Sequence, residues 1–171
     1  MSIITPEIEY VDRSIESIRY LEHGWPSDLC RWHSHREFEL HLIVATRGKA
    51  FVGDYIGEFR PGSLFLTGPY LPHNWVTDEI TSRHVSTRDM LVQFDQESVN
   101  SLSLAFPEFD DMRPMFELAC SGIEFSGFDA KLVQRRLAEI RNSSGPSRIL
   151  AFLQLLVEIN QHAEMRQLSV V

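Results

Sequence analysis

The chain contains the stretch Trp32-His33-Ser34-His35-Arg36-Glu37-Phe38-Glu39, and a further histidine, His73, follows a strand-like run and a proline-rich bend. His33 and His35 are two residues apart, so they share one face of an extended segment. Glu39 follows after a short turn, so it should stay close to the two histidines. Imidazole nitrogens and a carboxylate at close quarters are the donors that a divalent metal requires. The sequence therefore predicts four candidate metal ligands, which are His33, His35, Glu39 and His73.

Short apolar runs, separated by glycine and proline, surround these residues throughout the first half of the chain. Such punctuated runs are typical of strands and turns. Because the runs are short and frequent, with no helix-length periodicity between them, they predict an antiparallel sandwich or barrel. We expect strands at residues 14–22, 29–33, 38–46, 49–52, 55–59, 63–67, 73–77 and 88–94.

The hydrophobic pattern changes its period after residues 94–96. Residues 131–141 have apolar side chains on one side and basic side chains largely on the other, which predicts an amphipathic helix. A second predicted helix, residues 147–162, is apolar around most of its circumference and must be buried on more than one side. One side can pack on its own domain, and the other would face a second chain. The residues expected at such a dimer interface are Leu150, Leu153, Leu155 and Val157.

The overall composition narrows the class of protein. The chain has 171 residues, of which 43% are hydrophobic, and its formal net charge is −8, so it is a folded domain poorly suited to binding nucleic acid by itself. Its two cysteines, Cys30 and Cys120, lie far apart, which fits a reducing cytoplasm. No secretory signal and no transmembrane-length apolar run is visible, so we expect a cytoplasmic protein without a membrane segment.

The histidine-rich stretch resembles the first motif of the cupin superfamily, in which a glutamate follows His-x-His by four or five residues. The second cupin motif runs from a glycine to a histidine and is similar to the segment from Gly62 to His73. In that superfamily these residues are metal ligands, so the resemblance allows a divalent metal, zinc or nickel, although no cofactor is required. The chain departs from the superfamily pattern at Gly48, Gly68, Tyr70 and Thr77.

A narrower resemblance covers nearly the whole chain. The strings Glu39-Leu40-His41-Leu42, Pro61-Gly62-Ser63-Leu64-Phe65-Leu66 and Phe106-Pro107-Glu108-Phe109, with residues 145–153, resemble the sensor domain of AraC-type transcription regulators. This resemblance implies an α+β fold that is mainly β, with a cupin-type antiparallel β-barrel (jelly roll) followed by a C-terminal helical hairpin. It further implies an N-terminal arm at residues 1–13, an effector-binding barrel at 14–96 and a helical dimerisation segment at 97–171.

We accordingly expect the effector-sensing and dimerisation domain of an AraC-family regulator, and not an enzyme. Its partners would be a small-molecule effector, a sugar or an aromatic compound, and a second copy of the chain. DNA would be bound only through a helix-turn-helix domain that is absent from this chain. Aromatic walls around a few polar groups are usual for a small-molecule site. The residues expected to bind the effector are Trp32, His33, His35, Glu39, Tyr55, His73 and Trp75.

Other interpretations of the same residues remain open. The alternative function is a metal-dependent cupin enzyme, a dioxygenase or an isomerase, with the four candidate ligands around a metal that keeps positions open for substrate. The apolar tail favours the regulator over this enzyme. A third possibility is a dimerisation module with a filled barrel. Whatever the function, a vacant polar cluster is the alternative to an occupied metal site at the histidines. In the regulator, residues 1–13 would either close over the barrel or fray.

Overall fold

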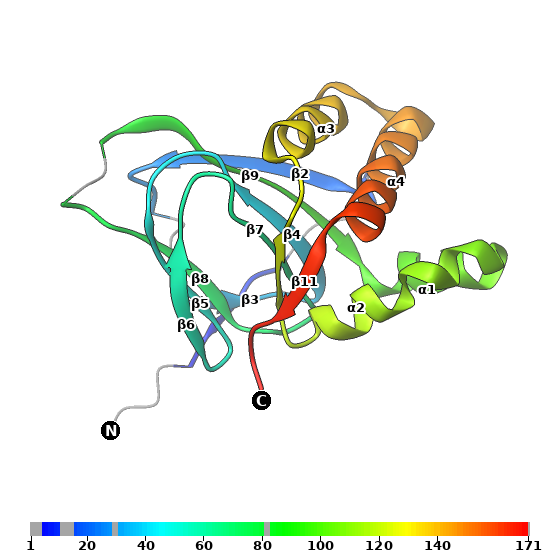
Figure 1. Ribbon diagram of the computed structural model, residues 1–171, viewed down its shortest axis with the longest axis horizontal. Coiled ribbons are helices and arrows are strands. Elements are labelled where there is room, and N and C mark those ends of the chain that lie inside the picture. The colour runs from blue at the N-terminus through cyan, green and yellow to red at the C-terminus, as the bar shows by residue number, and fades with distance from the viewer. Residues whose placement is uncertain (1–4, 11–15, 29–30, 81–82, 171) are drawn as a thin grey trace.

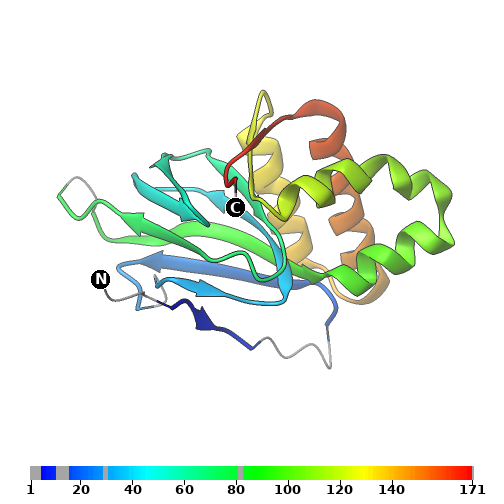
Figure 2. The same cartoon turned by 90° about the horizontal axis from the view of Figure 1, so that it is seen from below.

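The computed structural model of the chain describes residues 5–10, 16–28, 31–80 and 83–170 (Figure 1). These residues form a mainly β structure with two sheets, and the helices gather on one side of the molecule (Figures 1 and 2). The expectation of a mainly β fold with added helices is confirmed. The described strands pair into two sheets rather than into one closed barrel. None of the described helices is long and apolar enough to span a membrane.

The smaller sheet has five strands in the order β1-β3-β8-β5-β6. Its pairs are antiparallel except that β1 runs parallel to β3. β1 belongs to the expected N-terminal arm, whose residues 1–4 and 11–13 lie outside the described residues. The arm is thus tied to the sheet where it is described. The strands are β1 (Glu7–Ile8), β3 (His33–Ser34), β5 (Gly48–Val52), β6 (Tyr55–Phe59) and β8 (His73–Thr77).

The larger sheet has six antiparallel strands in the order β11-β10-β7-β4-β9-β2. Two of them, β10 and β11, come from the segment expected to be helical. Each has only four residues, and so short a run cannot be distinguished from a helix by its periodicity. The strands are β2 (Arg19–Trp25), β4 (Glu37–Ile43), β7 (Leu64–Thr67), β9 (Val85–Asp95), β10 (Ile123–Ser126) and β11 (Glu164–Gln167).

The predicted strands largely coincide with observed ones, with shifted ends. The strand expected at 14–22 begins only at Arg19, and the one expected at 29–33 contributes only His33. Residues 14–15 and 29–30 lie outside the described part of the chain. The two predicted helices correspond to α3 (Ala130–Asn142) and α4 (Gly145–His162). The sequence reasoning missed α1 (Gln96–Ala105), the 3-10 turn Pro107–Met112 and α2 (Arg113–Ala119).

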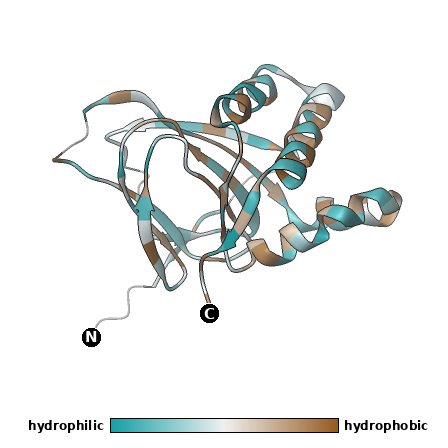
Figure 3. Cartoon of the chain, in the orientation of Figure 1, coloured by the Kyte–Doolittle hydropathy of each residue, from teal (hydrophilic) through white to brown (hydrophobic). Residues whose placement is uncertain are grey.

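Strand β4 is buried along its whole length because both faces of its sheet are covered. Leu40 and Leu42 belong to the core that the larger sheet shares with α2, α3 and α4. Ile43 belongs to the second core, which lies between the sheets. Figure 3 shows hydrophobic residues concentrated on the central strands. Since successive side chains of a strand point to opposite faces, Glu39 and His41 must lie on the Ile43 face, between the sheets.

Candidate metal centre

The four predicted ligands converge between the two sheets. His33 on β3 and His73 on β8 are directly opposite each other across one antiparallel pair, and Glu39 comes from β4 of the facing sheet. His35 lies in the short connection from β3 to β4. One nitrogen or oxygen of each residue can be chosen so that all four atoms lie within 4.8 Å of one another. The spacing in the sequence therefore reflects a real cluster in space.

The three imidazole rings are oriented by the backbone. Each ring donates its Nδ1–H to a carbonyl oxygen two residues away, which fixes the tautomer. Nε2 is then the atom that would hold a metal, as in many metal-ligating histidines whose other nitrogen is hydrogen-bonded. In His35 this atom lies 3.2 Å from Oε2 of Glu39 and is hydrogen-bonded to it. The three bonds run from His33 to Arg31 (2.8 Å), from His73 to Leu71 (2.8 Å) and from His35 to Glu37 (3.1 Å).

Glu39 supplies the carboxylate and is itself held on both oxygens. His41 donates to Oε1 at 2.7 Å, and Gln93 donates to Oε2 at 3.0 Å. Burial by itself raises the pKa of Glu39, but hydrogen bonds from His35 and His41 outweigh it and hold this pKa well below its usual range. Glu39 is therefore ionised at neutral pH although it is buried.

The surroundings of the buried Nε2 atom of His73 show whether the four candidate ligands suit a metal ion. It has no hydrogen-bond partner among the described residues, and it lies 3.7 Å from Oε1 of Glu39. Burial lowers the pKa of His73 to about 3, so the ring is neutral and carries a lone pair on Nε2. Buried polar atoms are normally satisfied, and an unsatisfied one requires an explanation. A lone pair aimed at an ionised carboxylate and two further imidazoles fits a metal ion.

A charged network lies behind Glu39. Nε2 of His41 is 3.4 Å from Oδ2 of Asp89, and Arg88 donates to that oxygen from Nε at 2.7 Å. Asp89 also binds Nδ1 of His23 at 2.8 Å through its other oxygen. Burial lowers the pKa of His41, but the charge of Asp89 outweighs this effect and raises it to about 9. His41 is therefore a cation that bridges two anions, Glu39 and Asp89.

Neither His41 nor His23 is among the site residues that the sequence analysis predicts. The direction of His41 could have been decided from Glu39, because residues two apart in a strand share a face. His23 offered no such signal. Its contact with Asp89 depends on the pairing of β2 with β9, where His23 and Asp89 are directly opposite.

The N-terminal arm adds a second carboxylate at the mouth of the site. Strand β1 lies beside β3, and the backbone N–H of Glu9 donates to the Ser34 carbonyl at 2.8 Å. This places Oε2 of Glu9 3.7 Å from Nε2 of His33. The cavity beside these residues measures about 60 Å³. Its polar lining includes Glu9, Arg31, Asn74 and Gln93, and its apolar lining includes Leu21, Trp75 and Leu91.

The aromatic residues expected to bind an effector do not all reach this cavity. Trp75 lines it and stacks on Phe65 with ring centroids 4.5 Å apart. Trp32 is half-buried and does not line it. Tyr55 lies on β6, where its hydroxyl accepts a hydrogen bond from Arg166 at 3.0 Å, and it does not line the cavity either.

The expected dimer residues differ in exposure. Leu150 is 68% exposed near the start of α4, whereas Leu155 is fully buried within its own chain. Leu153 and Val157 are partly buried against the core that the larger sheet shares with the helices. Leu155 therefore needs no cover from a second chain, and its assignment to an interface is corrected. Burial by α3 and the sheet accounts for most of the apolar circumference of α4.

No protein-family model and no curated protein matches the chain. Among solved structures, the chain is similar to HEPD from Streptomyces albus, solved with substrate 2-hydroxyethylphosphonate and Fe(II) bound. The TM-score is 0.36 at 11% sequence identity, and the match covers 92% of this chain and 45% of that chain. The chain thus spans less than half the length of that structure. We base the functional conclusion on the site and not on this similarity.

The expectation of a non-enzymatic, effector-sensing and dimerisation domain of an AraC-family regulator is corrected by the site. The four residues form a compact donor set that could hold a metal ion. Their imidazoles are pre-oriented, and the buried Nε2 of His73 has no hydrogen-bond partner within the described part of the chain. These findings favour the alternative, a metal-dependent enzyme.

Proposed function

We propose that the chain is a metal-dependent enzyme whose two sheets form a cupin-type sandwich around His33, His35, Glu39 and His73. The observation that carries the proposal is the orientation of the three histidines, each with Nδ1 bound to a backbone carbonyl and Nε2 directed into the cluster. Three nitrogens and one oxygen suit a first-row transition metal such as iron, nickel or zinc. Such an ion would act as a Lewis acid on a substrate oxygen.

The cavity beside the ligands limits the substrate to a small polar compound. A volume of about 60 Å³ holds roughly four water molecules when each needs about 15 Å³. Arg31 and Asn74 line the space with hydrogen-bond donors, and Trp75 forms a flat apolar wall. We infer a substrate of a few non-hydrogen atoms with a carbonyl or hydroxyl group.

Glu9 supports proton transfer as the reaction, because it holds a carboxylate at the mouth of the cavity. Its Oε2 lies 3.7 Å from Nε2 of His33, so a substrate bound beside that ligand lies within reach of Glu9. A carboxylate so placed can take a proton from the hydroxyl-bearing carbon next to a carbonyl and return it to the carbonyl carbon, while the hydroxyl proton passes to the former carbonyl oxygen. Among the two enzyme classes considered, this residue favours an isomerase over a dioxygenase.

Proton exchange with solvent provides the test. The protein is loaded separately with Fe(II), Ni(II) and Zn(II) and incubated in heavy water with small hydroxyketones and hydroxyaldehydes. We expect deuterium incorporation at the carbon next to the carbonyl, measured by mass spectrometry. Glu9→Gln should lower the exchange rate by about 10²- to 10⁴-fold, the usual contribution of a general base. Metal affinity, measured by calorimetry, should stay unchanged, which separates the proton-transfer role from metal binding.

Glu7 provides a matched control. It lies on the same strand β1, but its carboxylate pairs with Arg31 at 3.1 Å. Glu7→Gln should leave the exchange rate within about threefold, the size of effect expected from an exposed ion pair. Oxygen consumption without deuterium exchange would show a dioxygenase and contradict the isomerase. Neither activity with any of the three metals would contradict the enzyme.

A further inference from the structure

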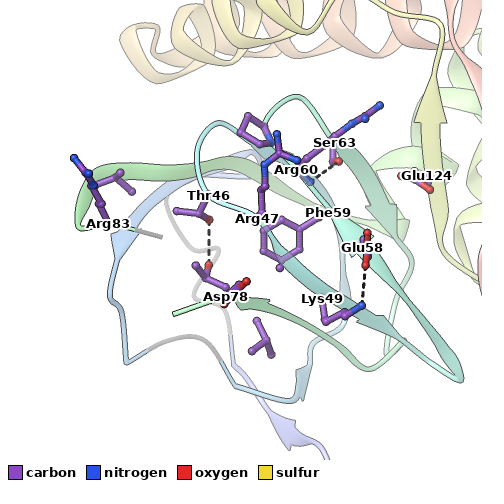
Figure 4. A pocket seen from close by; sticks show the side chains of 15 residues that line it. Thr46, Arg47, Lys49, Glu58, Phe59, Arg60, Ser63, Asp78, Arg83 and Glu124 are labelled. Carbon is purple, nitrogen blue, oxygen red and sulfur yellow. Dashed lines mark hydrogen bonds and ion pairs between the residues drawn. The ribbon is translucent and has the colours of Figure 1, made fainter. Parts of the chain in front are cut away.

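A second and much larger cavity opens elsewhere in the fold. It measures about 1070 Å³ and shares no lining residue with the metal cavity. Its wall is built from residues 46–49, the end of β6 and the following turn, the end of β8 and residues 83 and 85 (Figure 4). A space of this size can take a drug-sized molecule. The proposed enzyme reaction leaves this cavity without a role.

Arginines without a carboxylate partner gather at this second cavity. Among the described residues, only Arg47, Arg60, Arg83 and Arg135 are arginines with no carboxylate within 4.0 Å. The first three line the cavity, and Arg135 lies on α3. In Figure 4, Arg83 lies to one side, apart from Arg47 and Arg60. With its one lysine and three carboxylates counted, the cavity lining carries a net charge of +1 in a chain whose net charge is −8.

The acidic residues on the cavity wall already have other partners. Glu58 accepts a hydrogen bond from Lys49 at 3.0 Å, and Glu124 pairs with Arg166. The carboxylate of Asp78 accepts the backbone N–H of Ile80 at 2.9 Å. None of these carboxylates bridges to Arg47, Arg60 or Arg83. The guanidinium groups of the cavity are therefore available to a bound anion.

The base of the cavity is closely packed. Phe59 is 2% exposed, and a Cβ atom on Gly48 would lie 2.8 Å from its ring and 1.9 Å from the Val76 carbonyl oxygen. Glycine is therefore required at position 48. Thr46 has a φ of +72°, which a β-branched residue rarely adopts, and its hydroxyl lies 3.1 Å from that of Thr77. Unusual backbone of this kind is found at ligand-binding loops.

We propose that this second cavity binds a small phosphate-bearing molecule with at least two negative charges. The guanidinium group offers planar pairs of N–H donors that match phosphate oxygens, and it keeps its charge at all physiological pH values. Three guanidinium groups at one cavity provide more positive charge than a ligand with a single carboxylate requires. The inference stands apart from the proposed enzyme, because no residue of the metal cluster contributes to this cavity.

Inorganic pyrophosphate is the probe for the test. The protein is stripped of metal, and calorimetry is performed in about 0.1 M salt, where interactions between distant exposed charges are largely screened. We expect saturable binding of one pyrophosphate per chain. An Arg47→Gln, Arg60→Gln double variant should bind at least tenfold more weakly, and Arg83→Gln alone should weaken binding several-fold. Arg135→Gln, which removes an unpaired arginine outside the cavity, should bind as the parent does. His73→Ala should also bind normally.

Two results would overturn the proposal. One is the absence of saturable binding by the parent up to about 10 mM pyrophosphate, which corresponds to a very weak site. The other is an equal loss of affinity in Arg135→Gln and in the double variant, which would indicate binding by general surface charge. All the substituted arginines are exposed, so circular dichroism should show folded variants. A pyrophosphate affinity that falls only in His73→Ala would assign the binding to the metal cluster and contradict a separate site.

Discussion

Asp89→Asn is the substitution that most directly tests the charged network behind the proposed metal ligands. Asp89 has no exposed surface, and its carboxylate lies 2.6 Å from one guanidinium nitrogen of Arg88. The same carboxylate lies 2.8 Å from His23 and 3.4 Å from His41. Asparagine keeps the shape of the side chain but removes the negative charge. It leaves the guanidinium of Arg88 buried without this counterion, and it leaves the imidazolium of His41 paired with Glu39 alone.

The loss of folding stability in Asp89→Asn follows from the burial of the two cationic partners, Arg88 and His41. Breaking a buried ion pair by removing one charge costs about 3–5 kcal/mol, because the other charge stays desolvated. Arg88 is 3% exposed and His41 is 2% exposed, so this range applies to the site. Domains are stable by about 5–15 kcal/mol, so the variant should remain folded but markedly weakened. Urea unfolding of metal-free protein at pH 7, with linear extrapolation, measures the loss as a lower midpoint at unchanged slope.

Glu58→Gln provides the control for Asp89→Asn, because the Glu58–Lys49 pair is exposed. This change should alter the free energy of unfolding by less than about 1 kcal/mol. If Asp89→Asn also cost less than about 1 kcal/mol, the buried network would not be charged. The positive charge assigned to His41 would then be wrong.

Two further predictions concern pH and assembly. The pKa of His41 is raised to about 9 in the folded protein, so its stabilisation of about 3 kcal/mol should be complete below about pH 6.5 and lost as pH rises through about 9. Urea unfolding between pH 6.5 and 10 should therefore show a steeper loss for the metal-free parent than for Asp89→Asn, and parallel profiles would contradict the assignment. Ile149 and Leu150 are 42% and 68% exposed at the start of α4, and we expect the chain to dimerise there because a symmetric contact would cover them. Sedimentation at tens of micromolar should show a dimer for the parent and a monomer for Leu150→Asp, and a monomeric parent would contradict the interface.

Local patterns predicted most of the strands and the metal cluster. The His-x-His spacing and the nearby Glu39 specified three ligands within one short segment. His73 was added from its place after a strand-like run and a proline-rich bend, and the second cupin motif matches that position. The alternation of side-chain directions along β4 also determines that His41 points between the sheets. What the sequence could not give was the pairing of distant strands, such as β2 with β9, which brings His23 to Asp89. Register between distant strands is set by the whole fold, not by the residues of either strand.

The expectation of a regulator was wrong because it depended on the apolar helix predicted at residues 147–162. An all-round apolar helix must be buried on several sides, but its own chain can provide most of that cover. The six-stranded sheet and α3 bury Leu155 and Leu156 completely or nearly so. Only Ile149 and Leu150 are exposed large apolar residues on this helix. The histidine tautomers, which decide the chemistry, depend on backbone carbonyl positions that no sequence pattern reveals.

Metal binding tests the central claim most directly. Calorimetric titration of metal-free protein with Ni(II) or Zn(II), followed by thermal unfolding, should show one tightly bound ion per chain and a raised melting temperature, because a ligand that binds only the folded state stabilises it. His73→Ala removes a buried ligand nitrogen that has no hydrogen-bond partner among residues 5–10, 16–28, 31–80 and 83–170. It should abolish both the binding and the gain in melting temperature. An unchanged melting curve for the parent at saturating metal, or full binding by His73→Ala, would contradict the metal centre.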